Sequence, residues 1–436
     1  MFNTNNMTTK ISITLLSVVL LFLSSCSGLD IEPRMAIDPE TLGQDEVQQL
    51  LTGTYRSLQY EPGRDTWVLF DMRGENLIHT YLSGPNDFVN NNIPSNNGVL
   101  LTMWRGYYKV INQANVALST LSKLERTENN LNIEAQARFL RAYAYYCLAT
   151  RWDGVPLLKE NTLDRVKRDR QTTVFQFIKE ELDYCINSNL KSFKTLSGAP
   201  FYVSKEAAIA LQARLALTMG DKTTAGNLAE ELINSAVFTL SDDYDNIFTS
   251  QSNSEIIFSL RNSTSENPQN LYALFTTYDS PMRGSWFLCP SPKSEQMFED
   301  ENDLRRATCI TYLQSTSGEY VIMNKFRDYG PLIISRIAEM YLISAEARGL
   351  DGLNRLNELR VKRGLQVLQI SSVNEYEQAV ALERRKELYC EGFYYFDLVR
   401  TGKVEEELIS MRGKTDFYLP LPESEAKYNS DLREYN

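Results

Sequence analysis

Residues 135–150, with the sequence AQARFLRAYAYYCLAT, restrict the fold of this chain more than any other segment. On a helix with 3.6 residues per turn, this segment is apolar on almost every side. A helix of that kind belongs in the interior of a protein, because each of its faces has to be removed from water. Its alanines allow neighbouring helices to approach closely. We therefore expect a protein built of packed helices, with this segment inside it.

Apolar residues recur at spacings of three and four along most of the chain from about residue 44 onward, which is typical of amphipathic helices. Strand patterns are few. Ser204 and Ser372 are expected to cap the starts of their helices, and Gly220 to follow the end of one. The predicted helices cover residues 44–60, 100–124, 135–150, 171–187, 204–219, 225–235, 334–348 and 353–363, and a further helix begins at residue 372.

Residues 204–235 predict a helical hairpin that resembles a tetratricopeptide unit. A short turn separates its two helices, and small residues line the faces that would meet. Residues 334–363 contain a second such pair. The pairs do not follow one another in strict tandem, which argues against a regular solenoid. The small residues of the first pair are Ala208, Ala213 and Ala216, Gly220 at the turn, and Ala225 and Ala229.

Two long segments, residues 61–98 and 261–330, interrupt the helical pattern. Both are rich in Asn, Ser, Gly, Pro and aromatic residues. Loops of more than about 15 residues inside a compact domain are usually functional or disordered. The many aromatic residues argue against disorder, because disordered segments are poor in them. The predicted fold class is therefore all-α, with tetratricopeptide-like helical pairs, long irregular loops and little β-structure.

The N-terminus carries a short apolar run, residues 11–25, that follows Lys10 and ends at Cys26. This layout is typical of a secretory signal, and the run is shorter than the about 20 residues that span a bilayer. Leu23-Ser24-Ser25-Cys26 matches the cleavage pattern of bacterial lipoproteins; an ordinary signal peptide with a chance cysteine is the alternative. We predict that Cys26 carries a lipid anchor.

These patterns divide the chain into a signal peptide (1–25), a lipid-anchored tether (26–43) and one domain (44–436). Within the domain, the helical core is expected at residues 44–60, 99–260 and 331–436. The two loops lie between these parts of the core, at residues 61–98 and 261–330.

Several classes of protein are disfavoured by composition. A formal charge of −11 without a basic tract argues against nucleic-acid binding. His79 is the only histidine, which excludes a multi-histidine metal site, and no nucleophile-elbow or dinucleotide-binding motif occurs. The charged run at residues 383–387, ERRKE, favours a solvated or salt-linked helix face over a binding patch. We expect no catalytic residues, no metal and no cofactor.

The cysteines after Cys26 are odd in number and irregularly spaced, which is no disulfide framework. Most are expected to be packing residues. A pair between Cys289 and Cys309 is the alternative for an oxidising compartment. The set is Cys147, Cys185, Cys289, Cys309 and Cys390.

The segment EAQARFLRAYAYYCLATRWDGVPLL, residues 134–158, resembles the SusD/RagB family of surface lipoproteins. One departure is Tyr394, where members often have a basic residue. Further blocks similar to the family follow in the expected order: WRGYYKVINQAN (104–115), EAAIALQARLALTMGD (206–221), FTLSDDYDNIF (238–248), RIAEMYLISAEA (336–347), LNELRVKRGL (356–365), ERRKELYCEGFYYFDLVRTG (383–402) and YLPLPESE (418–425).

The resemblance implies a SusD-like α-α superhelix whose irregular loops form the ligand face. It also implies a place in the outer membrane, lipid-anchored and facing the cell exterior, and a partner, a SusC-type TonB-dependent barrel transporter over which the protein sits as a lid. Family ligands are mostly glycans, and some relatives take peptides. The leading hypothesis is a non-enzymatic glycan-binding component of nutrient uptake. A peptide-binding relative and a lipid-anchored glycosidase are the alternatives.

Glycans need flat aromatic surfaces for stacking and polar groups for their hydroxyls, and both long loops supply these. The hypothesis also requires that the two loops lie on the same side of the protein. For each candidate residue, packing onto the helical core is the alternative. The candidates for stacking are Trp67, Tyr81, Tyr278 and Trp286, and those for hydrogen bonding are Arg73, Asn76, Asn86, Asp87 and Arg283.

Overall fold

The computed structural model describes residues 42–80, 87–263, 265, 269–280, 283–316 and 318–436. Gln44–Asn436 form one compact unit. Cys26, Tyr81 and Asn86 lie outside the described residues, so their roles stay predictions. Helices predominate in the described part of the chain, and none of them combines the length and apolar character needed to cross a bilayer.

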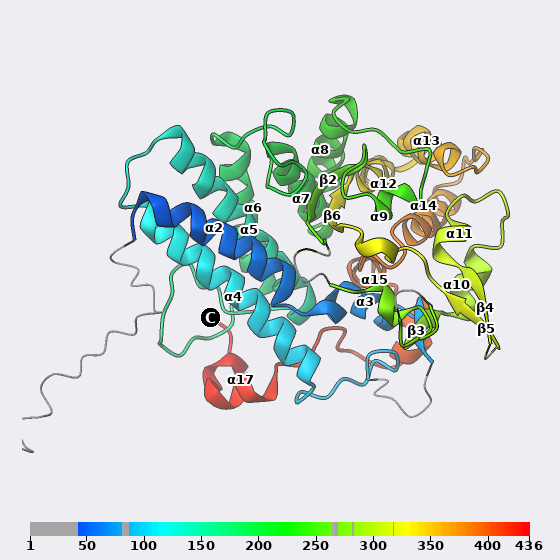
Figure 1. Ribbon diagram of the computed structural model, residues 1–436, viewed down its shortest axis with the longest axis horizontal. Helices are drawn as coiled ribbons and strands as arrows, with labels where there is room; N and C mark the ends of the chain where they lie inside the picture. The colour runs from blue at the N-terminus through cyan, green and yellow to red at the C-terminus, as the bar shows by residue number, and fades with distance from the viewer. Residues whose placement is uncertain (1–41, 81–86, 264, 266–268, 281–282, 317) are drawn as a thin grey trace, which may run out of the picture. The chain divides into compact units, whose positions relative to one another are not determined.

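Six long helices form the first half of the core, and each packs against the next along the chain. Figure 1 shows α2, α4, α5 and α6 side by side. Residues 135–150 lie in α5, where Leu140 and Tyr145 are fully buried, so the prediction of an interior helix is confirmed. The six helices are α2 (Gln44–Tyr60), α4 (Gly98–Leu121), α5 (Glu128–Trp152), α6 (Gln171–Asn187), α7 (Lys205–Thr218) and α8 (Lys222–Asn234).

A second group of helices follows the second long loop. Its first helix, α12, packs against α8 and so joins the two groups. The contact is close because α8 presents Gly226, where an added Cβ would lie 3.3 Å from Cβ of Ala347. The group consists of α12 (Ile337–Arg348), α13 (Leu353–Lys362), α14 (Val373–Glu387), α15 (Tyr394–Thr401), α16 (Val404–Glu407) and α17 (Glu423–Tyr428).

The predicted caps at Ser204 and Ser372 and the predicted turn residue Gly220 are confirmed. The side chain of Ser204 accepts a hydrogen bond from the backbone N–H of Ala207, and that of Ser372 from Glu375. Such caps satisfy backbone N–H groups that have no partner within the helix. Gly220 follows α7 with a φ of +81°, a conformation that glycine adopts without strain.

The described strands form three two-stranded antiparallel sheets. Strands β2 (Ile256–Leu260) and β6 (Leu332–Arg336) pair inside the helical core, and all of β2 is buried. The prediction that residues 334–336 begin a helix was wrong, because they belong to β6, and α12 starts at Ile337. The apolar run at residues 332–334 is too short to distinguish a buried strand from a buried helix.

Both long loops carry short elements. Residues 61–98 contain η1 (Arg64–Trp67), α3 (Leu69–Arg73) and β1 (Leu77–His79). Residues 261–330 contain η3 (Tyr272–Leu274), β3 (Leu288–Pro290), α10 (Pro292–Met297), α11 (Arg306–Cys309), β4 (Thr311–Ser315), β5 (Gly318–Ile322) and η4 (Arg327–Tyr329). A four-residue helix, α9 (Asn246–Thr249), precedes β2, and the 3-10 turns η5 (Gly349–Gly352), η6 (Ile409–Met411) and η7 (Ser430–Arg433) lie in the C-terminal part. The all-α class with little β-structure is confirmed.

The five described cysteines are free thiols with buried side chains. The alternative pair of Cys289 with Cys309 is therefore not formed. Burial raises the pKa of the Cys289 thiol to about 11 and that of Cys309 to about 12, so both are protonated at neutral pH. They act as small apolar packing groups.

Candidate functional site

The two long loops meet in a short antiparallel ladder between β1 and β3. Ile78 lies opposite Cys289, and His79 lies opposite Leu288. The ladder continues beyond the strands, where the backbone N–H of Thr80 donates to the carbonyl of Phe287 at 3.0 Å. Two segments about 200 residues apart in the sequence thus share one side of the protein, as the glycan-binding hypothesis requires.

Residues 272–280 and 283–286, before β3, form a scaffold linked by backbone hydrogen bonds. Arg283 and Trp286 have φ values of +45° and +44°, which cost non-glycine residues of the order of 1–3 kcal/mol each. The N–H of Arg283 donates to Ser280, and that of Trp286 donates to the carbonyl of Thr276 at 2.8 Å. Gly284 between them has no room for a Cβ, which would lie 2.1 Å from the Thr276 oxygen. These contacts therefore fix the backbone from which both side chains project.

We use the name aromatic face for Tyr278, Arg283 and Trp286 of this scaffold together with the next residue, Phe287, and with Tyr320 of β5, which packs on Trp286. Tyr278 is 74% exposed and Phe287 is 42% exposed. The guanidinium of Arg283 lies 5.9 Å from the centre of the Tyr278 ring. The rings of Trp286 and Tyr320 meet edge to face at 4.6 Å, and the Trp286 indole N–H donates to Val321 at 3.0 Å.

The hairpin of β4 and β5 packs against the residues that form the aromatic face. Asp279 links the two parts, because it accepts hydrogen bonds from Thr277 at 2.6 Å and from Ser315, at the end of β4, at 2.5 Å. These bonds hold the pKa of the Asp279 carboxyl below its ordinary value. On β4, Tyr312 is exposed and donates to Glu295 at 2.8 Å.

An open groove of about 750 Å³ lies beside this hairpin, between the segment 242–245 before α9, helix α11 and strand β4. Tyr312 and Leu304, both about half exposed, form apolar parts of its wall. Its polar wall includes Asn324 and the ion pair of Asp245 with Arg327. The groove combines an aromatic surface with hydrogen-bonding groups, and it is large enough for a sugar residue.

Arg73 and Asn76 lie away from any surface. Arg73 is buried, donates to the side chain of Asn91 at 2.7 Å and to the carbonyl of Phe417 at 3.2 Å, and packs over the ring of Tyr395. Burial lowers the pKa of its guanidinium. Its Nε and Nη2 serve contacts within the first loop and with the C-terminal segment, whereas its Nη1 is buried without an acceptor among the described residues.

Asn76 is fully buried as well. Its amide donates to Asp71 at 2.9 Å and accepts from Arg385 at 2.9 Å, and its backbone carbonyl accepts from the Tyr389 hydroxyl. Burial raises the pKa of the Asp71 carboxyl to about 6. Asn76 therefore joins the first loop to the end of α14 and does not reach solvent.

Trp67 and Asp87 are partly exposed but are not among the residues that form the aromatic face. Trp67 packs on the core and lines the inner cavity described below. Asp87 accepts a hydrogen bond from Asn97, the residue that caps α4. Of the nine predicted ligand-binding residues, the structure brings together Tyr278, Arg283 and Trp286.

Sequence reasoning missed Tyr312 and Tyr320. Both lie in the segment TYLQSTSGEYVI, which forms β4 and β5. Two short β-rich runs around a Ser-Gly turn are a hairpin signal. That signal was available in the sequence, and it predicts the hairpin, although it does not predict the contact of Tyr320 with Trp286.

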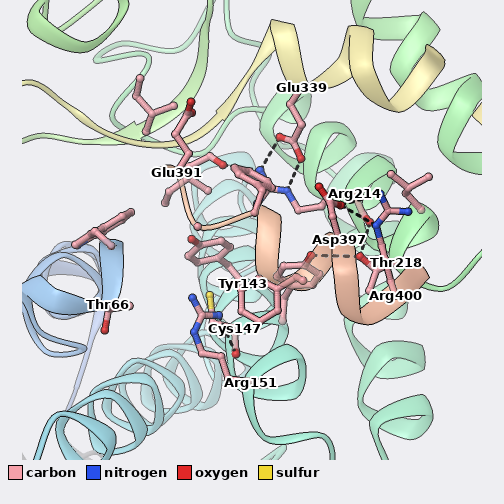
Figure 2. A pocket seen from close by; sticks show the side chains of 18 of the residues that line it. Thr66, Tyr143, Cys147, Arg151, Arg214, Thr218, Glu339, Glu391, Asp397 and Arg400 are labelled. Atoms are coloured by element: carbon pink, nitrogen blue, oxygen red, sulfur yellow. Dashed lines mark hydrogen bonds and ion pairs between the residues drawn. The ribbon is translucent and has the colours of Figure 1, made fainter. Parts of the chain in front are cut away.

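The inner cavity lies between α5, α7, α12 and α15 and has a volume of about 90 Å³ (Figure 2). Arg214 donates to both carboxylate oxygens of Glu339 across it, at 2.6 and 2.7 Å. On another side, Asp397 accepts hydrogen bonds from Arg384 and Arg400. Within the described residues, no group of three or more His, Cys, Asp and Glu side chains is placed to hold a metal ion.

Comparison with known proteins gives matches at both ends of the chain. A SusD-like family model described as starch-binding and associating with the outer membrane matches residues 29–217, and a model of the SusD family matches residues 315–434. SusD-like protein P38 of Formosa agariphila is 25% identical over 93% of this chain and 94% of that protein.

Solved structures match the fold. A SusD superfamily protein from Bacteroides thetaiotaomicron superposes with a TM-score of 0.78 at 21% identity, over 89% of this chain and 98% of that one. A laminarin-binding SusD-like protein superposes with a TM-score of 0.74 at 22% identity, over 90% and 98%. With two models of one family matching its N-terminal and C-terminal parts, and a relative aligned over nearly its whole length, the chain belongs to the SusD/RagB family.

Proposed function

We propose that this protein binds glycans at the cell surface and delivers them, as a lid, to a SusC-type TonB-dependent transporter of the outer membrane. The observation that carries the proposal is the aromatic face, where exposed Tyr278 stands beside Arg283 on a scaffold fixed by backbone hydrogen bonds. Family membership and the laminarin-binding relative support it.

The chemistry of the aromatic face suits a sugar. The ring of Tyr278 offers a flat apolar surface for the C–H groups of a pyranose, and Arg283 offers N–H donors for its hydroxyls. Backbone hydrogen bonds hold residues 283–286, which lowers the conformational entropy that binding would cost. Trp286 is half-buried and supports the face, and Phe287 extends it toward β1.

The proposed site keeps only part of the predicted set. It uses Tyr278, Arg283 and Trp286, and it adds Phe287 and Tyr320. Arg73 and Asn76 are left out because both side chains are buried away from this surface. Trp67, Asp87, Tyr81 and Asn86 stay predictions.

Calorimetric titration with laminarin, starch and xylan tests the site. Tyr278→Ala removes one stacking surface from an exposed position, so we expect about tenfold weaker binding of the preferred glycan with unchanged thermal stability. Tyr428→Ala is the matched control, because Tyr428 is 86% exposed but lies at the end of α17. Unaltered affinity of Tyr278→Ala for every glycan that the protein binds would overturn the proposed site.

The same preparation separates the alternatives. Binding of pooled oligopeptides in place of glycans would favour a peptide-capturing relative. Release of reducing ends from a bound glycan would favour a glycosidase, which needs two carboxyl groups flanking the scissile bond. We expect glycan binding without either result.

We further propose that a lipid on Cys26 holds the protein in the outer membrane, facing the exterior. Cys26→Ser should move it from the membrane fraction to the soluble fraction, because several acyl chains anchor a domain almost irreversibly. Protease accessibility on intact cells tests the orientation. Co-purification of a barrel with the native protein, but not with Cys26→Ser, tests the partnership.

A further inference from the structure

The inner cavity is lined by one arginine, Arg151, that has no carboxylate partner among the described residues. Four arginines and three carboxylates line the cavity, and two of these arginines, Arg384 and Arg400, also pair with Glu346, which lies outside the lining. The carboxylates are Glu339, Glu391 and Asp397, and the arginines are Arg151, Arg214, Arg384 and Arg400.

Each of the three carboxylates already has a cationic partner. Glu339 pairs with Arg214, and Asp397 with Arg384 and Arg400. Glu391 is held by two cations from outside the lining, Arg336 and Lys325. None of these carboxylates is left to balance a further charge.

Arg151, at the end of α5, has no carboxylate partner among the described residues. Only 9% of the Arg151 surface is exposed to solvent. It donates one hydrogen bond, from Nη1 to the carbonyl of Cys147 at 2.9 Å, and its Nε has no acceptor in the described part of the chain. Buried charges in proteins are almost always paired, because an uncompensated charge in a low-dielectric interior is costly.

Several other buried arginines of this protein bind a carboxylate through Nε and Nη2, the edge of the guanidinium group that has no carboxylate partner in Arg151. Arg214 uses Nε and Nη2 for the two oxygens of Glu339, and Arg384 uses the same two nitrogens for Asp397. Arg141 uses them for Glu181. The pair of Nε and Nη2 matches a carboxylate in spacing and direction. At Arg151 no described carboxylate occupies it.

Aromatic rings account for part of the stability of Arg151 but not for its hydrogen bonds. The guanidinium lies 4.8 Å from the ring centre of Phe70, 5.3 Å from Phe396 and 5.4 Å from Tyr107. Ring faces attract a cation electrostatically. They offer no lone pair to the Nε–H group, which stays without a conventional acceptor.

The cavity has the size for a small molecule. A water needs roughly 10–15 Å³ of such volume, so a space of about 90 Å³ holds a group of several atoms. A surface groove of about 520 Å³ lies next to it, and Leu217, Thr218 and Arg400 line both spaces and form part of the wall between them. Figure 2 shows Arg151 and Tyr143 on one side of the space, and Arg214 and Arg400 on another.

We propose that the inner cavity is a binding site for a small monovalent carboxylate, of the size of formate or acetate, with Arg151 as its receptor. The ligand supplies the carboxylate partner that Arg151 lacks among the described residues and accepts the hydrogen bond that its Nε does not make there. Its binding stabilises the packing of α5 against α15, which lies on the other side of the cavity.

Thermal melting of the lipid-free domain at constant ionic strength tests this site. Sodium formate and sodium acetate should raise Tm in a saturable way, whereas sodium gluconate, whose anion is too large, should not. Arg151→Met should lose this rise and should melt at or above the wild-type Tm in gluconate, since it removes an unbalanced buried charge.

Arg168→Met is the matched control, because Arg168 also has a buried Nε without an acceptor but lies outside the cavity lining. It should keep the full response to formate. Equal responses of wild type and Arg151→Met would overturn the proposal, because ions would then act elsewhere on the protein.

Crystals of the wild-type domain grown with formate give a second measurement that needs no variant. Planar density against the Nε edge of Arg151 is the expected result. Ordered water alone in the cavity at saturating formate, together with an unchanged Tm, would overturn the proposal even if Arg151→Met failed to fold.

Discussion

Arg363 donates hydrogen bonds to both carboxylate oxygens of Glu387, at 2.9–3.2 Å, and neither side chain is exposed to solvent. Arg305 and Arg336 bind the same carboxylate at 3.1 and 2.6 Å. Arg305 comes from the second long loop, Arg336 from β6 and Arg363 from the end of α13. Glu387 at the end of α14 therefore ties the loop that bears the aromatic face to the helical core.

Glu387→Gln should destabilise the domain strongly. The change leaves three buried guanidinium groups around a neutral side chain, and breaking a buried ion pair from one side typically costs about 3–5 kcal/mol. Urea unfolding followed by circular dichroism measures the free energy of unfolding. Glu358→Gln is the control, because Glu358 is 46% exposed in its pair with Arg355, and such pairs contribute at most about 1 kcal/mol. Similar losses in both variants would contradict the role of Glu387.

The same carboxyl group predicts how stability depends on pH. Burial alone would raise the pKa of Glu387, but the charges of Arg363, Arg336 and Arg305 outweigh it and hold the pKa well below its ordinary value. A carboxyl with a lowered pKa in the folded state contributes stability that is present above its unfolded pKa, about 4.3, and is lost as pH falls through the folded value. We expect the free energy of unfolding to fall steeply below about pH 4.

A comparison of two variants isolates this effect. Asp71, whose pKa burial raises to about 6, acts in the opposite sense, since its contribution decreases as pH rises from about 4 to 6. That contribution is the same in the wild type and in Glu387→Gln. The difference in free energy between them should therefore shrink as pH falls from 5 to 2, and a constant difference would contradict the assignment.

The helical core was readable from the sequence because its signals are local. Ser204 and Ser372 cap helices where the pattern predicted caps, and the apolar helix at 135–150 is buried. The charged run 383–387 is salt-linked, which agrees with the favoured interpretation of a solvated or salt-linked helix face. Its burial was not predictable, since the arginines around Glu387 come from positions 24 to 82 residues away.

The burial and the contacts of the loop residues could not be predicted from the sequence, because they depend on partners far along the chain. Arg73 and Asn76 occur in a polar loop segment, DMRGENL, that looks exposed. In the fold, Arg73 contacts a carbonyl 344 residues away and Asn76 an arginine 309 residues away. Local periodicity carries no information on such contacts. The strands β2 and β6 were missed because a short apolar run fits a buried helix as well as a buried strand.

Gly284→Ala should disturb the aromatic face. The added Cβ would lie 2.1 Å from the carbonyl oxygen of Thr276, a backbone atom that cannot move without breaking the hydrogen bond from Trp286. We expect at least tenfold weaker binding of the glycan that the wild type prefers, with a lower Tm. Calorimetry and thermal melting measure these.

Gly98→Ala is the control for this substitution. A Cβ at Gly98 would meet no atom within 4 Å, and the residue is the first of α4. Replacing glycine by alanine at an unstrained helical position stabilises by about 0.4–1 kcal/mol through the unfolded state. Wild-type glycan affinity in Gly284→Ala would show that the positions of Arg283 and Trp286 do not matter for binding.

Asn97→Ala should weaken the start of α4 and the loop before it. The side-chain oxygen of Asn97 accepts from the N–H groups of Val99 at 2.9 Å and Leu100 at 3.3 Å, and its amide donates to Asp87 at 3.0 Å. Loss of a cap of this kind costs about 1 kcal/mol. Asn97→Ser keeps an oxygen for the cap but gives up the bond to Asp87, so its loss in unfolding free energy should be smaller. If glycan binding depends on the position of Asp87, both variants should bind more weakly, whereas binding affected only in Asn97→Ala would assign the effect to the helix cap.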